Sequence, residues 1–293
     1  MEHNPDFANV YAKVSNWQQI RGLELLEEAT PESGESVLDI GCGPGELTAE
    51  MARRVGRDGR AFGIDPDAAR IELAKTRFGT ELPQLTFAVG RGEAMPKVAS
   101  GSFDLVYSNY AIQWIREKDR LLEEIWRCLK PGGRIALEMP AATTDVFEEV
   151  MAIAVGCKKN PLDSVYFVGE NEWLPLLRAQ GFSIQRSESF CNAMPFASAE
   201  AFYDWWEGTT HGAFQRSQIS ADERPGFEAT FAGGRTANVH SVRVLGTRPV
   251  TQRIFRFHGV GAGPLPLLAT PRMLPWVAGW GSGLVMPFER KIR

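Results

Sequence analysis

The sequence predicts a doubly wound α/β fold, on three observations. Short apolar runs of strand length alternate with helical segments through the first 140 residues. The first of these runs ends in a glycine-rich turn. The chain has 293 residues, of which 44% are hydrophobic, and can therefore bury a large core. Strands that alternate with helices of this length pair in parallel through right-handed crossovers. We therefore expect an open, mostly parallel sheet with helices on both faces.

The predicted elements follow in chain order. Residues 7–29 are expected to form a helix that caps the edge of the domain. The periodicity weakens beyond residue 141, and no structure is predicted for the tail 260–293. We expect a single domain over 1–259, with a cofactor half at 36–140 and substrate-cap elements at 1–30 and about 141–240. The strands are expected at 36–40, 61–65, 85–90, 103–109, 133–140, 183–190 and 250–259, and the further helices at 46–55, 66–78, 117–130 and about 144–157, 171–180 and 198–207.

Composition excludes several classes of protein. The net charge of −4 argues against a protein that coats nucleic acid, although residues 233–293 carry a net positive charge spread over single arginines. No apolar run approaches the roughly 18 to 20 residues of a membrane span. The four cysteines are scattered and no signal peptide is recognisable, so we expect reduced thiols in a cytoplasmic protein. We expect a monomer, and no His or Cys spacing typical of a metal site is present.

The run DIGCGPG at 39–45 lies where the first strand turns into a helix. Open α/β sheets bind ligands at this end of their strands, and glycine lets the backbone approach a ligand closely. A dinucleotide fingerprint needs a glycine at position 46, where this chain has Glu46, an acid that would repel a pyrophosphate. The acidic Asp39 suits a ligand with an ammonium and a sulfonium group. The turn therefore favours S-adenosylmethionine.

Asp65 ends the second predicted strand, 24 residues after Gly41. At this distance an acid can accept hydrogen bonds from both ribose hydroxyls of a nucleoside. The alternative is that Asp65-Pro66-Asp67 only caps the following helix. Together with the glycine turn, the spacing favours the nucleoside.

Four ordered segments, VLDIGCGPG, GIDPD, FDLVYSNYAIQWI and LKPGGRIALEMP, resemble the successive motifs of class I S-adenosylmethionine-dependent methyltransferases over residues 36–140. The resemblance implies a seven-stranded, mostly parallel, Rossmann-like sheet with helical caps. The sequence departs from the family pattern at Arg91, where many members have an acid that accepts a hydrogen bond from the adenine amino group. Backbone atoms or Glu93 would then contact the adenine instead. The cofactor residues that it implies are Asp39, Gly41, Gly43 and Gly45 around the methionine part, Asp65 and Pro66 at the ribose, Gly92 and Glu93 beside the adenine, and Asn109 near the transferred methyl.

Three narrower resemblances concern the methyl acceptor. SNYAIQWI and MPFASAEAFYDWW resemble the trans-aconitate methyltransferases, YAKVSNWQQ resembles the juvenile hormone acid methyltransferases, and malonyl-carrier methyltransferases have a similar SNxAxQW run. All three families methylate a carboxyl group. A carboxylate is ionised at pH 7 and needs no general base, which agrees with the lack of a Ser/His/Asp set in this sequence. We therefore expect O-methylation of a small carboxylic acid.

Five residues are candidates for the acceptor site: Gln18, Gln113 and Trp114 to orient the carboxylate, and Tyr11 and Trp17 to roof the pocket. The alternative for each is an ordinary place in the core or on the surface. The aromatic residues Phe202, Trp205 and Trp206 are expected in the core rather than in the pocket wall; if they line the site, the acceptor is partly apolar.

Other functions stay open or are disfavoured. His211 could act as a base on a hydroxyl acceptor, but a lone histidine in a polar loop is usually solvated. Methylation of an amine, phenol or carbon centre and a non-catalytic S-adenosylmethionine-binding module both stay open. Glu46 argues against a nicotinamide oxidoreductase, and the run SNYA at 108–111 is not the Asn-Pro-Pro-aromatic run of nucleobase methylation.

Overall fold

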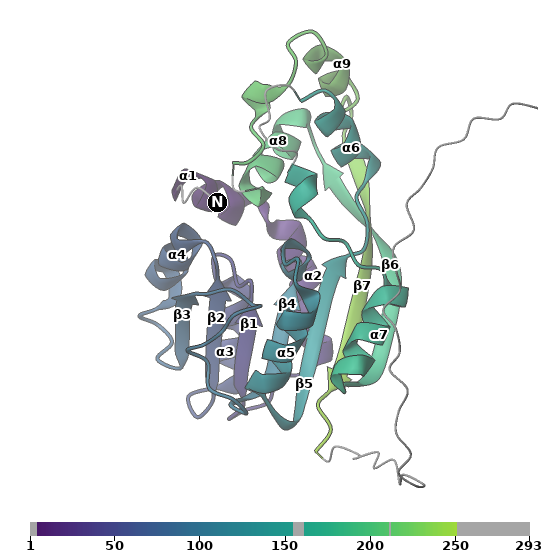
Figure 1. Ribbon diagram of the computed structural model, residues 1–293. Coiled ribbons are helices and arrows are strands. Elements are labelled where there is room, and N and C mark those ends of the chain that lie inside the picture. Colours follow the sequence, from purple (N-terminus) through teal and green to yellow (C-terminus); the bar gives the residue numbers. More distant parts are fainter. Residues whose placement is uncertain (1–4, 155–160, 211, 251–293) are drawn as a thin grey trace, which may run out of the picture. The chain divides into compact units, whose positions relative to one another are not determined.

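The computed structural model describes residues 5–154, 161–210 and 212–250 (Figure 1). All of these belong to the unit Met1–Gln252. Most of the predicted strand at 250–259, the tail 260–293 and the candidate base His211 lie outside the described residues.

One seven-stranded sheet forms the centre of the fold, in the order β3-β2-β1-β4-β5-β7-β6. The first five strands pair in parallel, and β7 pairs antiparallel with both β5 and β6. The doubly wound, mostly parallel sheet is thus confirmed. Its strands are β1 (Ser36–Ile40), β2 (Arg60–Asp65), β3 (Leu85–Val89), β4 (Phe103–Asn109), β5 (Leu129–Pro140), β6 (Ser183–Phe196) and β7 (Arg235–Thr247).

The sheet differs from the sequence prediction in its last strands. β7 was not predicted, yet it lies inside the sheet between β5 and β6. β6 continues to Phe196, well beyond the predicted end at residue 190. β5 pairs with β7 only from Arg134 to Pro140, so residues 235–240 of β7 pair with β6 alone. This two-stranded extension rises beyond the sheet and carries the cap described below.

Helices cover the sheet and form the cap. The predicted single helix at 7–29 is wrong in detail, because two helices meet at Ser15, a residue type that favours helix ends over helix interiors. In the crossover helix α3, Ala49, Ala52 and Val55 are buried, which gives the helix an apolar face for the sheet. The helices are α1 (Pro5–Val14), α2 (Asn16–Ala29), α3 (Glu46–Val55), α4 (Ala68–Phe78), α5 (Lys118–Cys128), α6 (Asp145–Ala152), α7 (Glu170–Gln180), α8 (Ala199–Thr209) and α9 (Arg224–Ala229).

The core has three parts. Val37 packs among side chains of α2, α3 and α4, while the next residue, Leu38, packs among side chains of α5 and α7. Successive side chains of a strand point to opposite faces, so these two clusters lie on the two faces of the sheet. The third cluster joins α6, α8 and α9 to the extension of β6 and β7. Figure 1 shows these helices above the carboxyl ends of the parallel strands, and we call this part the cap.

Candidate functional site

The turn between β1 and α3 contains glycines with positive φ angles that lie close to neighbouring side chains. Gly41 has a φ of +79°, and a Cβ at this position would collide with the Cβ of Ala111. Gly43 has a φ of +53°, but a Cβ there would meet only the Tyr11 ring, at 3.7 Å. The turn therefore needs glycine for its backbone conformation, and the Tyr11 ring packs over Gly43.

Asp65 supports this turn from the end of β2. Its buried carboxylate accepts hydrogen bonds from the main-chain N–H of Gly43 at 3.0 Å and of Asp67 at 2.9 Å. The cap of α4 is Asp67, which accepts from the N–H groups of Ala69 and Arg70. A carboxylate has about four acceptor positions, so two remain on Asp65 for ligand hydroxyls. Asp65 is thus not merely a helix cap.

Asp39 lies beneath the turn. It is buried, and it accepts a hydrogen bond from the hydroxyl of Thr48 at 2.6 Å. Burial raises the pKa of Asp39 to about 7, and the nearby charge of Asp65 acts in the same direction. Neither Asp39 nor Gly45 lines the cavities described below; Gly45 precedes α3 and packs against Phe87.

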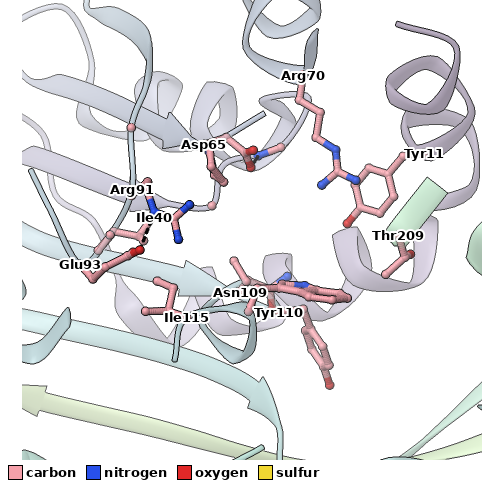
Figure 2. A pocket seen from close by; sticks show the side chains of 17 residues that line it. Tyr11, Ile40, Asp65, Arg70, Arg91, Glu93, Asn109, Tyr110, Ile115 and Thr209 are labelled. Atoms are coloured by element: carbon pink, nitrogen blue, oxygen red, sulfur yellow. Dashed lines mark hydrogen bonds and ion pairs between the residues drawn. The ribbon is translucent and has the colours of Figure 1, made fainter. Parts of the chain in front are cut away.

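A first cavity of about 790 Å³ opens at the carboxyl ends of β1, β2 and β4 (Figure 2). It lies at the point where the strand order reverses between β1 and β4, the usual ligand site of an open α/β sheet. The structure brings together most of the predicted cofactor residues here. The predicted residues that line it are Gly41, Gly43, Asp65, Pro66, Gly92, Glu93 and Asn109, together with Tyr11 and Trp114.

Arg91 and Glu93 form an ion pair of 2.5 Å at the rim of the first cavity, drawn as a dashed line in Figure 2. The Arg91 side chain is 62% exposed, whereas the Glu93 side chain is 10% exposed. Gly92 between them is buried against Ile40 and Ile115, where a Cβ would come within about 3 Å of both side chains.

Arg70 was missed by the sequence analysis, because nothing in the periodicity of α4 distinguishes it from a surface arginine. Its buried guanidinium lies over the ring of Tyr11, 4.1 Å from the centroid, and Figure 2 shows the two side chains facing each other. It also donates a hydrogen bond to the carbonyl of Gly208 at 2.8 Å. Arg70 therefore joins α4 to α1 and to α8 above the first cavity.

A second cavity of about 540 Å³ lies between α2, the end of β4 and the cap. It shares Tyr110, Trp114 and Thr209 with the first cavity. The predicted acceptor residues Trp17, Gln18, Gln113 and Trp114 all line it, whereas Tyr11 lines only the first cavity of these two. The remaining lining residues are Pro140, Ala142, Phe147, Leu162, Val165, Phe167, Met194, Trp205, Trp206 and Val239.

Several polar atoms around the second cavity are buried without a hydrogen-bond partner. Buried polar groups are nearly always paired, so these atoms are available to a bound ligand or to water. They are Oε1 of Gln18, Oε1 of Gln113, Oγ1 of Thr209 and the indole nitrogens of Trp205 and Trp206.

The short 3-10 helix Ile112–Trp114 is held firmly between the two cavities. The side-chain amide of Gln113 donates to the carbonyl of Tyr110 at 2.7 Å. The ammonium group of Lys118 donates to the carbonyls of Ile112 and Ile115 at 2.6 and 2.5 Å, and burial lowers its pKa to about 8. Lys118 is a second residue that the sequence analysis missed.

The aromatic residues of α8 all belong to the core. Phe202, Trp205 and Trp206 are buried in one cluster, as expected, and Trp205 and Trp206 also line the second cavity. Phe147 stacks on both indoles, at centroid distances of 5.3 and 4.5 Å. Trp17 packs edge-on against Tyr110 at 5.0 Å. The sequence spacing of Phe202, Trp205 and Trp206 places them on one face of α8 but does not predict which of them reaches a cavity.

Within the described ranges, no cluster of His, Cys, Asp and Glu could hold a metal ion. No helix there is long and apolar enough to cross a membrane.

Comparison with known proteins finds a matching family model and several similar enzymes. Residues 37–133 match a family model described as a methyltransferase domain. Over 48% of its length the chain is 38% identical to trans-aconitate 2-methyltransferase of Deinococcus radiodurans, of which the match covers 50%. The enzyme of the same description from Paracidovorax citrulli is 28% identical over 77% of this chain and 86% of its own. Arsenite methyltransferase of Mus musculus and 2-phytyl-1,4-naphtoquinone methyltransferase of Nostoc punctiforme match 48% and 44% of this chain at 33% and 29% identity.

Among solved structures, phosphoethanolamine N-methyltransferase 2 of Haemonchus contortus, with S-adenosylhomocysteine bound, shares the fold at a TM-score of 0.53 and 20% identity, covering 78% of this chain and 52% of that one. The chain spans about half the length of the first curated relatives it matches. The match at 37–133, the order of the seven strands and the cavity at their carboxyl ends agree with one another. The protein therefore contains a methyltransferase domain of the class that uses S-adenosylmethionine as its methyl donor.

Proposed function

We propose that the protein transfers the methyl group of S-adenosylmethionine to an oxygen of a small carboxylic acid. The observation that carries this proposal is the meeting of the two cavities at Tyr110 and Trp114. The first cavity has groups suited to a cationic nucleoside, and the second has an unpartnered hydroxyl and two unpartnered indole N–H groups that can donate to a carboxylate. A donor and an acceptor in these two spaces would meet at one boundary, as methyl transfer requires.

The first cavity fits S-adenosylmethionine. Asp65 retains two acceptor positions for the ribose hydroxyls, and the backbone of Gly41 and Gly43 at the cavity wall lets the methionine part approach closely. Oδ1 of Asn109 is buried without a partner and lies at the cavity wall, where a cationic group would satisfy it. Asp39 adds negative charge beneath the turn when it is ionised. When bound, S-adenosylmethionine supplies an electrophilic methyl group on a positively charged sulfur.

The second cavity fits an acceptor that needs orientation rather than deprotonation. Gln18 and Gln113 are buried at its wall. The NH₂ group of Gln113 donates one hydrogen bond to the Tyr110 carbonyl and has a second N–H left, while the amide of Gln18, whose oxygen is unpartnered, can turn over to present its NH₂ group. Both amides can therefore donate to a carboxylate, and Trp114 stands at the boundary with the first cavity. A carboxylate attacks the methyl carbon without a general base, so these residues act by positioning the acceptor and excluding water.

The similar enzymes give only general support for a carboxylic acid as the methyl acceptor. The two trans-aconitate methyltransferases carry the carboxyl acceptor in their description, whereas arsenite and naphtoquinone methyltransferases, with other acceptors, also match this chain. The choice of a carboxylic acid therefore rests on the groups around the second cavity.

The test is incubation of the full chain with S-adenosylmethionine labelled in the methyl group and a library of small acids. We expect S-adenosylhomocysteine to form together with a labelled product that mild alkali hydrolyses, because an ester is base-labile. Label that resists alkali would indicate transfer to nitrogen, carbon or a phenol and would overturn the carboxylate acceptor. Cofactor binding without transfer to any acceptor would indicate a binding module.

A further inference from the structure

We propose that the acceptor is a monocarboxylic acid with an apolar aromatic or aliphatic body, rather than a di- or tricarboxylic acid. This inference rests on the proposed function and narrows it to one substrate class. It departs from the tricarboxylic acid named in the description of the trans-aconitate relatives.

The walls of the second cavity are the first reason. They consist mainly of aromatic and aliphatic side chains, with Phe147 stacked on Trp205 and Trp206 along the cap side. Met194 and Val239 complete this side, and both are almost fully buried. An apolar body gains from leaving water for such a surface, whereas a charged one loses its hydration.

Charge is the second reason. Among the residues that the structure describes, none that lines the second cavity is charged. The neighbouring cations Arg21 and Arg243 are engaged elsewhere: the guanidinium Nε atoms of both contact the buried carboxylate of Glu138, at 3.2 and 2.6 Å. A second or third carboxylate would therefore enter this cavity without a cationic partner, which is strongly unfavourable.

The number of polar groups is the third reason. The unpartnered atoms are the amide oxygens of Gln18 and Gln113, one hydroxyl and two indole nitrogens. Of these, the Thr209 hydroxyl, which borders both cavities, and the two indole N–H groups can donate to one carboxylate, whereas the amide oxygens only accept. The rest of the cavity, at Leu162, Val165 and Phe167, offers only apolar side chains.

The experiment compares two acids that differ in a single group. Hexanoic acid and adipic acid have the same chain length, but adipic acid carries a second carboxylate at its far end. With the full chain and S-adenosylmethionine, formation of S-adenosylhomocysteine should give hexanoic acid a kcat/KM at least about 100-fold higher. Cinnamic acid and trans-aconitic acid extend the comparison to an aromatic monoacid and a triacid, with the same ranking expected.

A pair of variants tests the cause. Met194→Lys introduces a cation into the wall at nearly constant length, and should reduce the preference for hexanoic over adipic acid at least about tenfold. Met194→Leu is the matched control and should retain the preference. Equilibrium dialysis measures the dissociation constant of each acid from the protein saturated with S-adenosylhomocysteine. These constants should rank the acids in the same order without catalysis. Circular dichroism checks that both variants fold. If a variant does not fold, the comparison of hexanoic with adipic acid in the unsubstituted protein still tests the proposal.

The outcomes separate this inference from the proposed function. Equal or better turnover of adipic or trans-aconitic acid, with alkali-labile products, would overturn the inference and leave carboxylate methylation intact. Failure to methylate any acid, with the cofactor bound, would overturn both.

Discussion

Asn109 and Gln18 join the two cavities directly: the side-chain NH₂ of Asn109 donates a hydrogen bond to the main-chain carbonyl of Gln18 at 2.9 Å. Asn109 ends β4 and lines the first cavity, while Gln18 belongs to α2 and lines the second. Two residues earlier on β4, the hydroxyl of Tyr107 donates to the carbonyl of Gly22 at 2.7 Å. Helix α2 is thus fastened to the central strand at two points, which fixes the acceptor side relative to the donor side.

Gln18→Ala should lower kcat/KM for the acid acceptor by about 10- to 100-fold, because the amide that orients the carboxylate is lost. The dissociation constant of S-adenosylmethionine should stay within a few-fold of the parent value, since the main-chain carbonyl that holds Asn109 remains. Ile20→Ala, at a 58% exposed position of the same helix, is the control and should change neither quantity. Loss of cofactor binding in Gln18→Ala would remove this residue from the acceptor site.

Asp65→Ala should weaken binding of S-adenosylmethionine by about 1 to 3 kcal/mol, because the ribose hydroxyls and the N–H of Gly43 lose a charged acceptor together. Isothermal titration calorimetry measures this as a rise in the dissociation constant of roughly 5- to 150-fold. Glu81→Ala, at an exposed position, is the control. An unchanged dissociation constant in Asp65→Ala would exclude Asp65 from the nucleoside site.

Cofactor affinity should depend on pH through Asp39. Its pKa of about 7 leaves the carboxyl group partly protonated at neutral pH, and a cationic ligand favours the ionised form. Binding of S-adenosylmethionine should therefore tighten as the pH rises from about 6 to about 8, by up to roughly tenfold. In Asp39→Asn, calorimetry over the same range should give a nearly flat profile. A flat profile in the parent protein would contradict the assignment.

Arg70→Lys should reduce the free energy of unfolding by about 1 to 3 kcal/mol, because lysine cannot both stack on Tyr11 and donate to Gly208 as the planar guanidinium does. Urea denaturation followed by circular dichroism measures the change. Arg77→Lys on the same helix, where the arginine is half-exposed and pairs with Glu46, should change stability by less than about 1 kcal/mol. Equal effects of the two variants would show that the contacts of Arg70 with α1 and α8 add no stability.

The sequence by itself determined the parallel half of the fold and most of the first cavity. Strand, glycine turn and helix follow one another locally, so Gly41 and Gly43 could be placed at the carboxyl end of β1 without the structure. Asp65 could be placed beside them, because parallel strands bring their carboxyl ends to one edge of the sheet. Gln18, Gln113 and Trp114 were predicted from motifs, and the structure brings them to one cavity, while their roles stay predictions.

Only the tertiary structure decided the antiparallel end of the sheet and the shape of the acceptor space. β7 pairs with β5 and β6 across long sequence separations, and local periodicity carries no information on such partners. Arg70 resembles a surface residue in the sequence, and its role follows from Tyr11 and Gly208, which lie far from it along the chain. Trp205 and Phe202 share one face of α8 and both lie in the core, yet only the tertiary packing decides that Trp205 also reaches the second cavity.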